Sequence, residues 1–429
     1  MLVSPNRLEH TVRTLTEEIG VRLAGSPEEA RAAEALASEF RAVTDDVRIE
    51  RFPVLQRVVR SENYAVRTAG VWRAFRASLF NSAPGTAGET REAELVFFDT
   101  ATGYRNPNLG HLRGKAVVHL GCHIESGENY RRLMEAQPAF LLFVDTRYPG
   151  NAALADGLFP AYVKKYGAIP SVNVAYLDAW NWKVSGADSV RIAIDSELAP
   201  SETTVVAAEL AGTCPAEGIL FAGGHHDTQA GTVGADDNAI GSAAVTELAR
   251  VLARRPHRRT VRLLSFGAEE QLSAGSAAYV RRHRSELETR GLFMCNFDTF
   301  GSAMGWADFT VNATDALRDR IREVFHSRGL YFAEHTEPVP YTDQFPFAAC
   351  GVPGMWIFRK NCDAGVFYHH RHDADAGKLD FSIAAEHVAA AAELLSQLAD
   401  VRDFSPYRGI PAAMRPGIDT LFQTVFGGF

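Results

Sequence analysis

Apolar residues recur with a helical period at the start of the chain. Four of them fall on one face of a predicted helix over residues 7–20: Leu8, Val12, Leu15 and Ile19. The run Ser26–Glu29 then combines a capping serine, a proline suited to a first turn and a glutamate three residues after the cap. It predicts a second helix, whose small residues over 32–40 form its buried face. Residues 47–50 alternate like a strand.

The pattern changes over residues 60–205, where short apolar runs are separated by turns and a helical period is rare. The clearest predicted strands cover residues 93–98, 115–120, 139–144 and 170–174. This section contains no cluster of candidate catalytic residues. We therefore expect residues 60–205 to form a β-rich domain inserted into a domain that begins with residues 1–59.

Strands and helices alternate after residue 205. The predicted strands are 203–210, 218–222, 261–266, 291–297 and 355–358, and the predicted helices are 237–254, 276–283, 314–328 and 381–398. Alternating βα units predict a doubly wound α/β fold, with a mostly parallel sheet covered by helices on both faces. We expect this domain to span 206–405. The tail 406–429 has no apolar period, and we expect it to pack on the domain or on a partner in a homo-oligomer.

Composition and charge narrow the class of protein. At 429 residues, with 46% hydrophobic and 22% charged residues, the chain is long enough for two globular domains. A net charge of −8 without a Lys/Arg-rich run argues against a nucleic-acid partner. No apolar run approaches the ~20 residues that a membrane span needs. The first residues lack a secretory signal pattern, and the five cysteines are odd in number and sparse, so we predict a cytoplasmic protein.

The stretch Ile219–Asn238 carries the first candidate chemistry. The apolar run Ile219–Ala222 is followed by two glycines and then by His225, His226 and Asp227, as at the end of a buried parallel strand. A glycine-punctuated loop brings a second acidic pair, Asp236–Asp237, just before a predicted helix.

Other predicted strands also end in polar groups. Glu269–Glu270 follows one strand, Asp298 follows another, and the segment 368–373 reads YHHRHD after a third. Each has a structural explanation when taken singly: Asp237 as a helix cap, the Glu pair as a solvated loop, a histidine as a packed side chain. Because the carboxyl ends of parallel strands form one edge, these groups converge, and burying so many unpaired charges is costly. A metal site removes that cost.

Imidazole and carboxylate ligands without clustered thiolates suit zinc best, with manganese or cobalt as alternatives. Two histidines and four carboxylates are too many for one tetrahedral ion. They suit two ions about 3.5–4 Å apart that share a carboxylate and a water.

Six motifs in the C-terminal half resemble those of the zinc-dependent aminopeptidase family. That family includes bacterial leucine aminopeptidases and glutamate carboxypeptidase II, with glutaminyl cyclases and the transferrin receptor as distant relatives. The motifs are GGHHDT (223–228), GADDNAIG (234–241), GAEEQLSAGSAAYV (267–280), NFDTFG (296–301), YTDQFPFAACGVPG (341–354) and YHHRHD (368–373). Residues 1–55 are similar to the family's lead-in. LRGKAVVHL and AIPSVNVAYLDA resemble its protease-associated insert.

The resemblance implies a set of five metal ligands. His225 and Asp298 would bind one zinc ion, and Glu270 and His369 would bind the other. Asp236 would bridge the two ions.

The resemblance also implies the roles of the groups around the metals. Glu269 would be the general base, and Asp227 would orient the imidazole of the first histidine ligand. Tyr368 would donate its hydroxyl to the oxyanion. Asp237 would hold the backbone next to the bridge. His226, His370 and His372 leave the choice of histidine ligands ambiguous.

The predicted function is metal-dependent hydrolysis of a peptide or small amide substrate, with an aminopeptidase that releases N-terminal residues as the favoured activity. A carboxypeptidase, a dipeptidase or a small-amide hydrolase on the same centre is the alternative. A non-catalytic, receptor-like scaffold would have lost ligands that this chain retains. Gln344 and Gly354 depart from the family pattern in a segment that shapes specificity, so the preferred side chain stays open.

Overall fold

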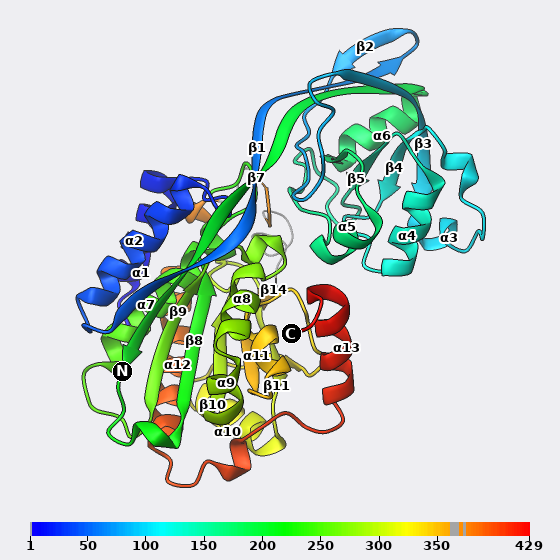
Figure 1. Ribbon diagram of the computed structural model, residues 1–429. Coiled ribbons are helices and arrows are strands. Elements are labelled where there is room, and N and C mark those ends of the chain that lie inside the picture. The colour runs from blue at the N-terminus through cyan, green and yellow to red at the C-terminus, as the bar shows by residue number, and fades with distance from the viewer. Residues whose placement is uncertain (1, 361–368, 372–374) are drawn as a thin grey trace. The chain divides into compact units, whose positions relative to one another are not determined.

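The computed structural model describes residues 2–360, 369–371 and 375–429, which form two compact units (Figure 1). The main unit comprises Met1–Val54, Ser201–His369 and Asp373–Phe429. The second unit, called the insert below, comprises Leu55–Pro200 with His370–His372. Two long strands, β1 (Val47–Thr68) and β7 (Ser189–Leu210), contribute residues to both units.

The main unit is built on a mixed sheet whose centre is parallel. The central strands, in spatial order, are β9 (Thr260–Phe266), β8 (Ile219–His225), β10 (Gly291–Phe297) and β13 (Gly354–Ile357). The flanking strands are β7, β11 (Trp306–Asn312), β12 (Phe332–His335) and β14 (Arg359–Lys360). β7 runs antiparallel to β9, and β11 runs antiparallel to β13. A parallel sheet is therefore confirmed for the centre, whereas the flanks are mixed.

Helices cover both faces of this sheet (Figure 1). One face carries α1 (Pro5–Arg13), α2 (Pro27–Arg41), α7 (Ile240–Leu252), α10 (Asp315–Ser327) and α12 (Phe381–Asp400). The other carries α8 (Ala274–Arg282), α9 (Arg284–Arg290) and α11 (Gln344–Ala349). Side chains alternate along a strand, so Leu220 and Ala222 join the first apolar cluster while Ile219 and Phe221 join the second. Burial on both sides explains the continuous apolar runs of these strands.

The insert is itself an α/β unit. β3 (Thr90–Asp99), β4 (Ala116–Leu120), β5 (Phe140–Val144) and β6 (Ser171–Val174) form a parallel sheet, and β1 pairs with β2 (Val71–Ala74). The helices are α3 (Thr100–Gly103), α4 (Gly127–Ala136), α5 (Pro160–Tyr166) and α6 (Tyr176–Ser185). The sequence pattern did not predict these helices, because they are at most 10 residues long and show too few turns for a period. The likeness to a protease-associated domain stays a prediction.

The tail contains a helix that the sequence pattern did not predict. α13 (Arg415–Phe426) buries Ile418 and Phe422 against Phe345 and Ala348 of the main unit. Its 12 residues begin with Arg-Pro-Gly, so the apolar pattern extends over little more than two turns. The tail therefore packs on the main unit.

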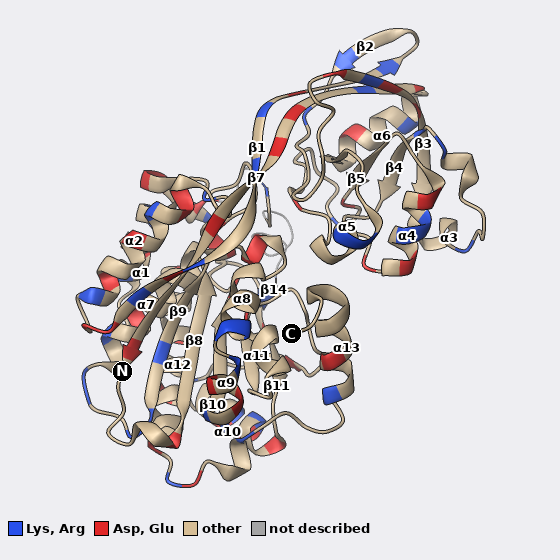
Figure 2. Cartoon of the chain, in the orientation of Figure 1, with Lys and Arg blue, Asp and Glu red and all other residues tan. Residues whose placement is uncertain are grey.

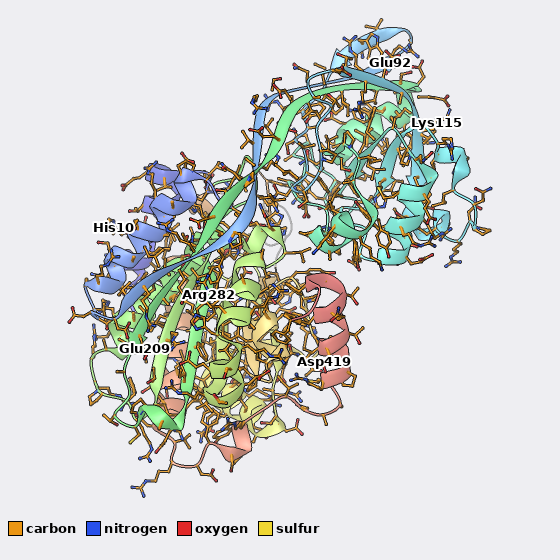
Figure 3. The ribbon with its side chains drawn as sticks, in the orientation of Figure 1. His10, Glu92, Lys115, Glu209, Arg282 and Asp419 are labelled. Atoms are coloured by element: carbon orange, nitrogen blue, oxygen red, sulfur yellow. The ribbon has the colours of Figure 1, made fainter. Side chains whose placement is uncertain are left out.

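Charged side chains of both signs alternate along the outer helices (Figure 2), as in the Arg131–Glu135, Arg284–Glu288 and Arg415–Asp419 pairs. Glu209 and Arg262, on neighbouring strands, form a cross-strand ion pair of 2.7 Å (Figure 3 labels Glu209). Exposed pairs contribute only about 0.3–0.5 kcal/mol each, so the apolar clusters dominate stability. In the part of the chain that the structure describes, no helix has the length and apolar character that a membrane crossing requires.

Candidate metal centre

Three neighbouring strands deliver polar side chains to one edge of the main sheet. His225 is the last residue of β8, and it lies opposite Phe266, the last residue of β9. Glu269 follows β9 after two further residues, and Asp298 directly follows β10. All of these side chains are buried. The predicted convergence at the carboxyl ends of the strands is what the structure shows.

Asp237 lies between two imidazoles. Its Oδ1 is 3.0 Å from Nε2 of His225, and its Oδ2 is 3.0 Å from Nδ1 of His369. Asp298 Oδ1 is 3.5 Å from the same nitrogen of His225. Ligand atoms of His225, Asp237 and Glu270 all lie within 4.8 Å of one another. The carboxylate of Asp237 thus faces both histidines that were predicted as ligands, one for each metal ion.

Asp236, which was expected to take this bridging position, lies elsewhere. Its Oδ1 accepts a hydrogen bond of 2.7 Å from the backbone N–H of Gly301, and burial raises its pKa to about 7. The backbone is irregular here, with φ/ψ of −123°/86° at Asp237 and −143°/47° at Asn238. Spacing along the sequence therefore could not show which of two adjacent aspartates points inward. Of the two aspartates, Asp237 is the one whose carboxylate faces both His225 and His369.

Asp227 connects the histidine of one strand with the turn after another. One of its carboxylate oxygens is 3.4 Å from Nδ1 of His225 and accepts the backbone N–H of Glu269 at 3.0 Å. Its other oxygen accepts the N–H of Glu270 at 3.2 Å. Asp227 therefore fixes the imidazole and the Glu–Glu turn together, which adds a backbone contact to the orienting role that the resemblance implied.

The turn that carries Glu269 and Glu270 has an unusual backbone. Ala268, Leu272 and Ser273 have φ values of 55°, 61° and 45°, in the left-handed region that side chains disfavour. Ser273 Oγ donates a hydrogen bond of 3.0 Å to Oε1 of Glu269. Strained residues of this kind persist where the surroundings over-determine them, and they cluster at functional sites.

Acidic groups perturb one another strongly at this edge. Burial, reinforced by Asp343 and Asp298, raises the pKa of Glu269 well above its usual value. Burial alone would lower the pKa of His225, but the carboxylates of Asp298, Asp227 and Asp237 outweigh it and raise this pKa. Burial likewise raises the pKa of Asp343 to about 7. The sequence offered no signal for Asp343, whose motif continues into a helix.

The donor set fits divalent metal ions. Two ligand atoms on a tetrahedral ion with bonds near 2.0–2.1 Å lie about 3.3 Å apart. The distances from Nε2 of His225 to Oδ1 of Asp237 and to Oδ1 of Asp298 are 3.0 and 3.5 Å, one slightly below and one slightly above that value. Imidazole and carboxylate donors without a thiolate suit zinc, and a concentration of buried carboxylates favours a bound cation.

The family model of peptidase family M28 matches residues 205–395, which contain these strand ends. Residues 205–395 are similar to this family and are called the M28 domain below. The prediction that the chain is a peptidase is thereby confirmed.

Similarity to known proteins extends beyond the M28 domain and covers nearly the whole chain. Aminopeptidase YwaD of Bacillus subtilis is 24% identical over 419 residues, which cover 95% of this chain and 85% of that protein. Among solved structures, a peptidase M28 precursor of Shewanella amazonensis has a TM-score of 0.81 at 21% identity and covers 95% of both chains. BSAP, a zinc aminopeptidase of Bacillus subtilis, has a TM-score of 0.76 at 17% identity and covers 95% of this chain and 98% of its own. The shared fold thus includes the insert.

The histidines of the M28 domain that were not assigned as ligands have different surroundings. His226 points away from the centre: its Nδ1 is 2.9 Å from Ser265 Oγ, and its Nε2 is 3.5 Å from Glu29. His370 has a φ of 53°, and its carbonyl accepts the backbone N–H of Ala155 within the insert. Tyr368 and His372 lie outside the described residues.

The two departures from the family pattern lie against each other in the M28 domain. Gln344 is buried and donates from Nε2 to Thr342 Oγ1 at 2.6 Å. A Cβ added at Gly354 would lie 3.2 Å from both Cβ and Cγ of Gln344. A side chain at position 354 would therefore crowd Gln344, so we expect the two positions to accept changes best when they are changed together.

Gly275 holds the Glu269–Glu270 turn close to the start of α8. A Cβ at this position would lie 1.9 Å from the carbonyl oxygen of Gly267, which is backbone and cannot rotate away. We expect Gly275→Ala to destabilise the fold by about 1–3 kcal/mol through overpacking and to reduce peptidase activity by displacing the turn. Chemical denaturation beside an activity assay checks this prediction.

Gly417 provides the matched control, because it also lies in the first turn of a helix but has no atom of the described residues within 4 Å of an added Cβ. Gly417→Ala should leave activity unchanged and stability equal or up to about 1 kcal/mol higher. Equal behaviour of the two variants would contradict the close-contact argument.

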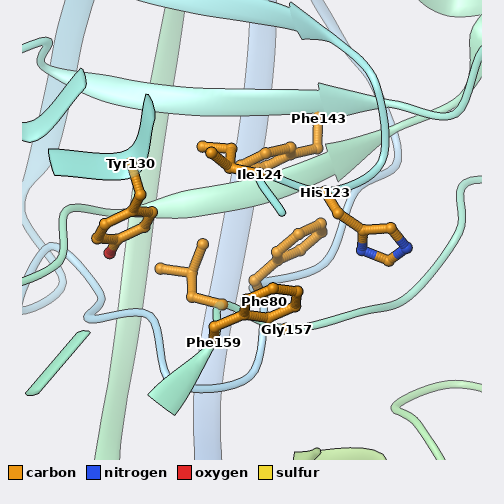
Figure 4. Close-up of a pocket in the computed structure, with 8 residues that line it drawn as sticks. Phe80, His123, Ile124, Tyr130, Phe143, Gly157 and Phe159 are labelled. Atoms are coloured by element: carbon orange, nitrogen blue, oxygen red, sulfur yellow. The ribbon is translucent and has the colours of Figure 1, made fainter. Parts of the chain in front are cut away.

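An apolar cavity in the insert is too small to compete as a ligand site. It is lined by Phe80, His123, Ile124, Tyr130, Phe143, Gly157, Leu158 and Phe159 (Figure 4). Its volume of about 10 Å³ has room for about one water molecule. The strand ends of the M28 domain therefore remain the candidate site.

Proposed function

We propose that the chain is a zinc aminopeptidase with two metal ions, which cleaves the N-terminal residue from peptides. The observation that carries this proposal is the position of Asp237, with one oxygen 3.0 Å from His225 and the other 3.0 Å from His369. A carboxylate with an imidazole on each oxygen is suited to bridging two ions about 3.5–4 Å apart.

The proposed ligands follow from this arrangement. His225 and Asp298 would hold one ion, and Glu270 and His369 would hold the other. Asp237 replaces Asp236 as the shared ligand. Asp227 keeps the His225 ring oriented, because its carboxylate contacts Nδ1 and leaves Nε2 to face Asp237 and Asp298.

Glu269 is the proposed general base. Its Oε2 lies 3.9 Å from His225 Nε2, farther from that nitrogen than the carboxylate oxygens of Asp237 and Asp298. Two bound ions would acidify a shared water and polarise the scissile carbonyl. The Glu269 carboxylate would accept a proton from the attacking water and deliver it to the departing amine. Ser273 Oγ holds the other oxygen of Glu269 in place.

Two observations favour an aminopeptidase over the other hydrolases. YwaD, which aligns with 95% of this chain, carries that name, and so does BSAP, whose fold matches over the same share. A receptor-like scaffold is disfavoured because the described ligand positions all carry side chains able to bind a metal. Hydrolysis of free-amine, amine-blocked and carboxyl-blocked dipeptides tests the choice: an aminopeptidase cleaves the carboxyl-blocked peptides and spares the amine-blocked ones. The cytoplasmic location and a homo-oligomer stay predictions.

The metal content tests the centre itself. We expect elemental analysis of the purified protein to find about two zinc ions per chain, and chelation to abolish activity that added zinc, manganese or cobalt restores. A fully active protein that contains no transition metal would contradict the proposal. A stoichiometry near one at full activity would contradict the second ion.

A further inference from the structure

Arg22 is a buried cation beside the metal centre to which neither the sequence motifs nor the proposed mechanism assigns a role. Its exposed fraction is 0%, and it lies in the segment between α1 and α2. Burying a charge costs several kcal/mol unless hydrogen bonds compensate, so a fully buried arginine needs a specific explanation.

The Arg22 side chain donates hydrogen bonds to main-chain carbonyls on two segments. Nε donates to the carbonyl of His226 at 2.6 Å, and Nη1 donates to that of Val233 at 3.0 Å. Nη1 also donates to Leu15 and Gly20 at 2.9 and 2.7 Å. The guanidinium thus ties the N-terminal segment to both ends of the loop 226–233.

The backbone of Arg22 binds a further residue of the same loop. Its N–H donates to Thr228 Oγ1 at 2.9 Å, and its carbonyl accepts the N–H of Thr228 at 3.0 Å. Arg22 therefore contacts this loop at residues 226, 228 and 233. The loop forms most of the connection between His225 and Asp237, which face each other across 3.0 Å.

The charge of Arg22 also suits this location. Burial lowers the pKa of Arg22 to about 10, while Asp227, Glu270 and Asp237 act to raise it, so the side chain stays protonated at neutral pH. It supplies a fixed positive charge among carboxylates that would otherwise repel one another before a metal ion arrives.

We infer that Arg22 is a positioning residue that preforms the His225–Asp237 connection for metal binding. Its fork of donors holds the loop in the liganding conformation, and its charge reduces repulsion among the carboxylates. Loss of Arg22 should therefore weaken metal affinity more than it lowers the turnover of the metal-saturated enzyme. This inference rests on the proposed metal centre.

Arg259 is a matched control. It is also buried, with an exposed fraction of 3%, and donates to the main-chain carbonyls of Leu398, Ala399 and Val401. It precedes β9, at the opposite end of that strand from Phe266 and the metal centre. Arg259→Met thus removes a comparable set of hydrogen bonds without touching the loop 226–233.

The test compares wild type, Arg22→Met, Arg22→Lys and Arg259→Met by zinc titration against a competing chelator and by denaturation of the metal-free proteins. We expect Arg22→Met to weaken zinc affinity about 10–100-fold, as supporting contacts to metal ligands do, and Arg259→Met to stay near wild type. Arg22→Lys should be intermediate, with kcat at saturating zinc within a few-fold of wild type. If Arg22→Met does not fold, the zinc affinity of Arg22→Lys decides.

Two outcomes overturn the inference. In one, the Arg22 variants lose stability as Arg259→Met does but bind zinc like wild type, which would make Arg22 a structural residue only. In the other, Arg259→Met weakens zinc affinity equally, which would make the effect a general loss of stability. A wild-type protein that binds no zinc would instead refute the proposed function, so the two failures are distinguishable.

Discussion

Glu269→Gln should lower the turnover about 10²–10⁴-fold while both metal ions stay bound. The amide has the shape of the carboxylate and keeps an oxygen to accept the hydrogen bond from Ser273, so the turn has no reason to move. What is lost is the ability to take a proton from the attacking water. Metal stoichiometry measured beside kcat on one carboxyl-blocked dipeptide checks this expectation.

Glu270→Gln is the control at the neighbouring residue, and we expect it to lose metal where Glu269→Gln retains it. Glu270 has a ligand atom within 4.8 Å of those of His225 and Asp237, so the amide weakens metal binding. Its activity loss should be partly recovered by excess zinc, whereas that of Glu269→Gln should not. If Glu269→Gln lost the metal and Glu270→Gln kept it while inactive, the two roles would be exchanged.

The positions of His225, Glu269–Glu270 and Asp298 could be predicted because each follows a continuous apolar run. Such runs belong to strands buried on both faces, and the carboxyl ends of parallel strands share one edge. Hydrophobic pattern and chain direction together therefore brought residues from three strands into one site. The helices on both faces followed from the alternation of strands with amphipathic runs.

Several short helices and the direction of the flanking strands could not be predicted in this way. α4 and α6 of the insert have 10 residues each, and α13 has 12, so their apolar positions do not repeat often enough to separate a helix from a loop. The flanking strands of the main sheet are antiparallel, which an alternating βα pattern does not encode. Contacts such as those of Arg22 join residues about 200 positions apart, and no local pattern predicts them.

The choice between Asp236 and Asp237 was beyond the sequence for a different reason. In a regular helix or strand, side-chain directions follow from spacing, but the backbone at Asp237 and Asn238 is neither helical nor in a strand. In such a loop, the sequence pattern cannot predict which of two adjacent aspartates points toward the histidines. Only the contacts distinguish them: Asp237 faces His225 and His369, whereas Asp236 accepts the N–H of Gly301.

Asp237→Asn should therefore abolish activity and release metal, whereas Asp236→Asn should preserve both within a few-fold. Loss of the shared carboxylate removes a negative ligand from both ions, so the loss of metal affinity should exceed the about 10–100-fold typical of supporting residues. Burial raises the pKa of Asp236 to about 7, so its replacement by a neutral amide removes less charge than the loss of an ordinary aspartate would. The asparagine oxygen can still accept the N–H of Gly301. Zinc titration and peptidase assays of both variants decide, and a metal-free Asp236→Asn beside an active Asp237→Asn would restore Asp236 as the bridge.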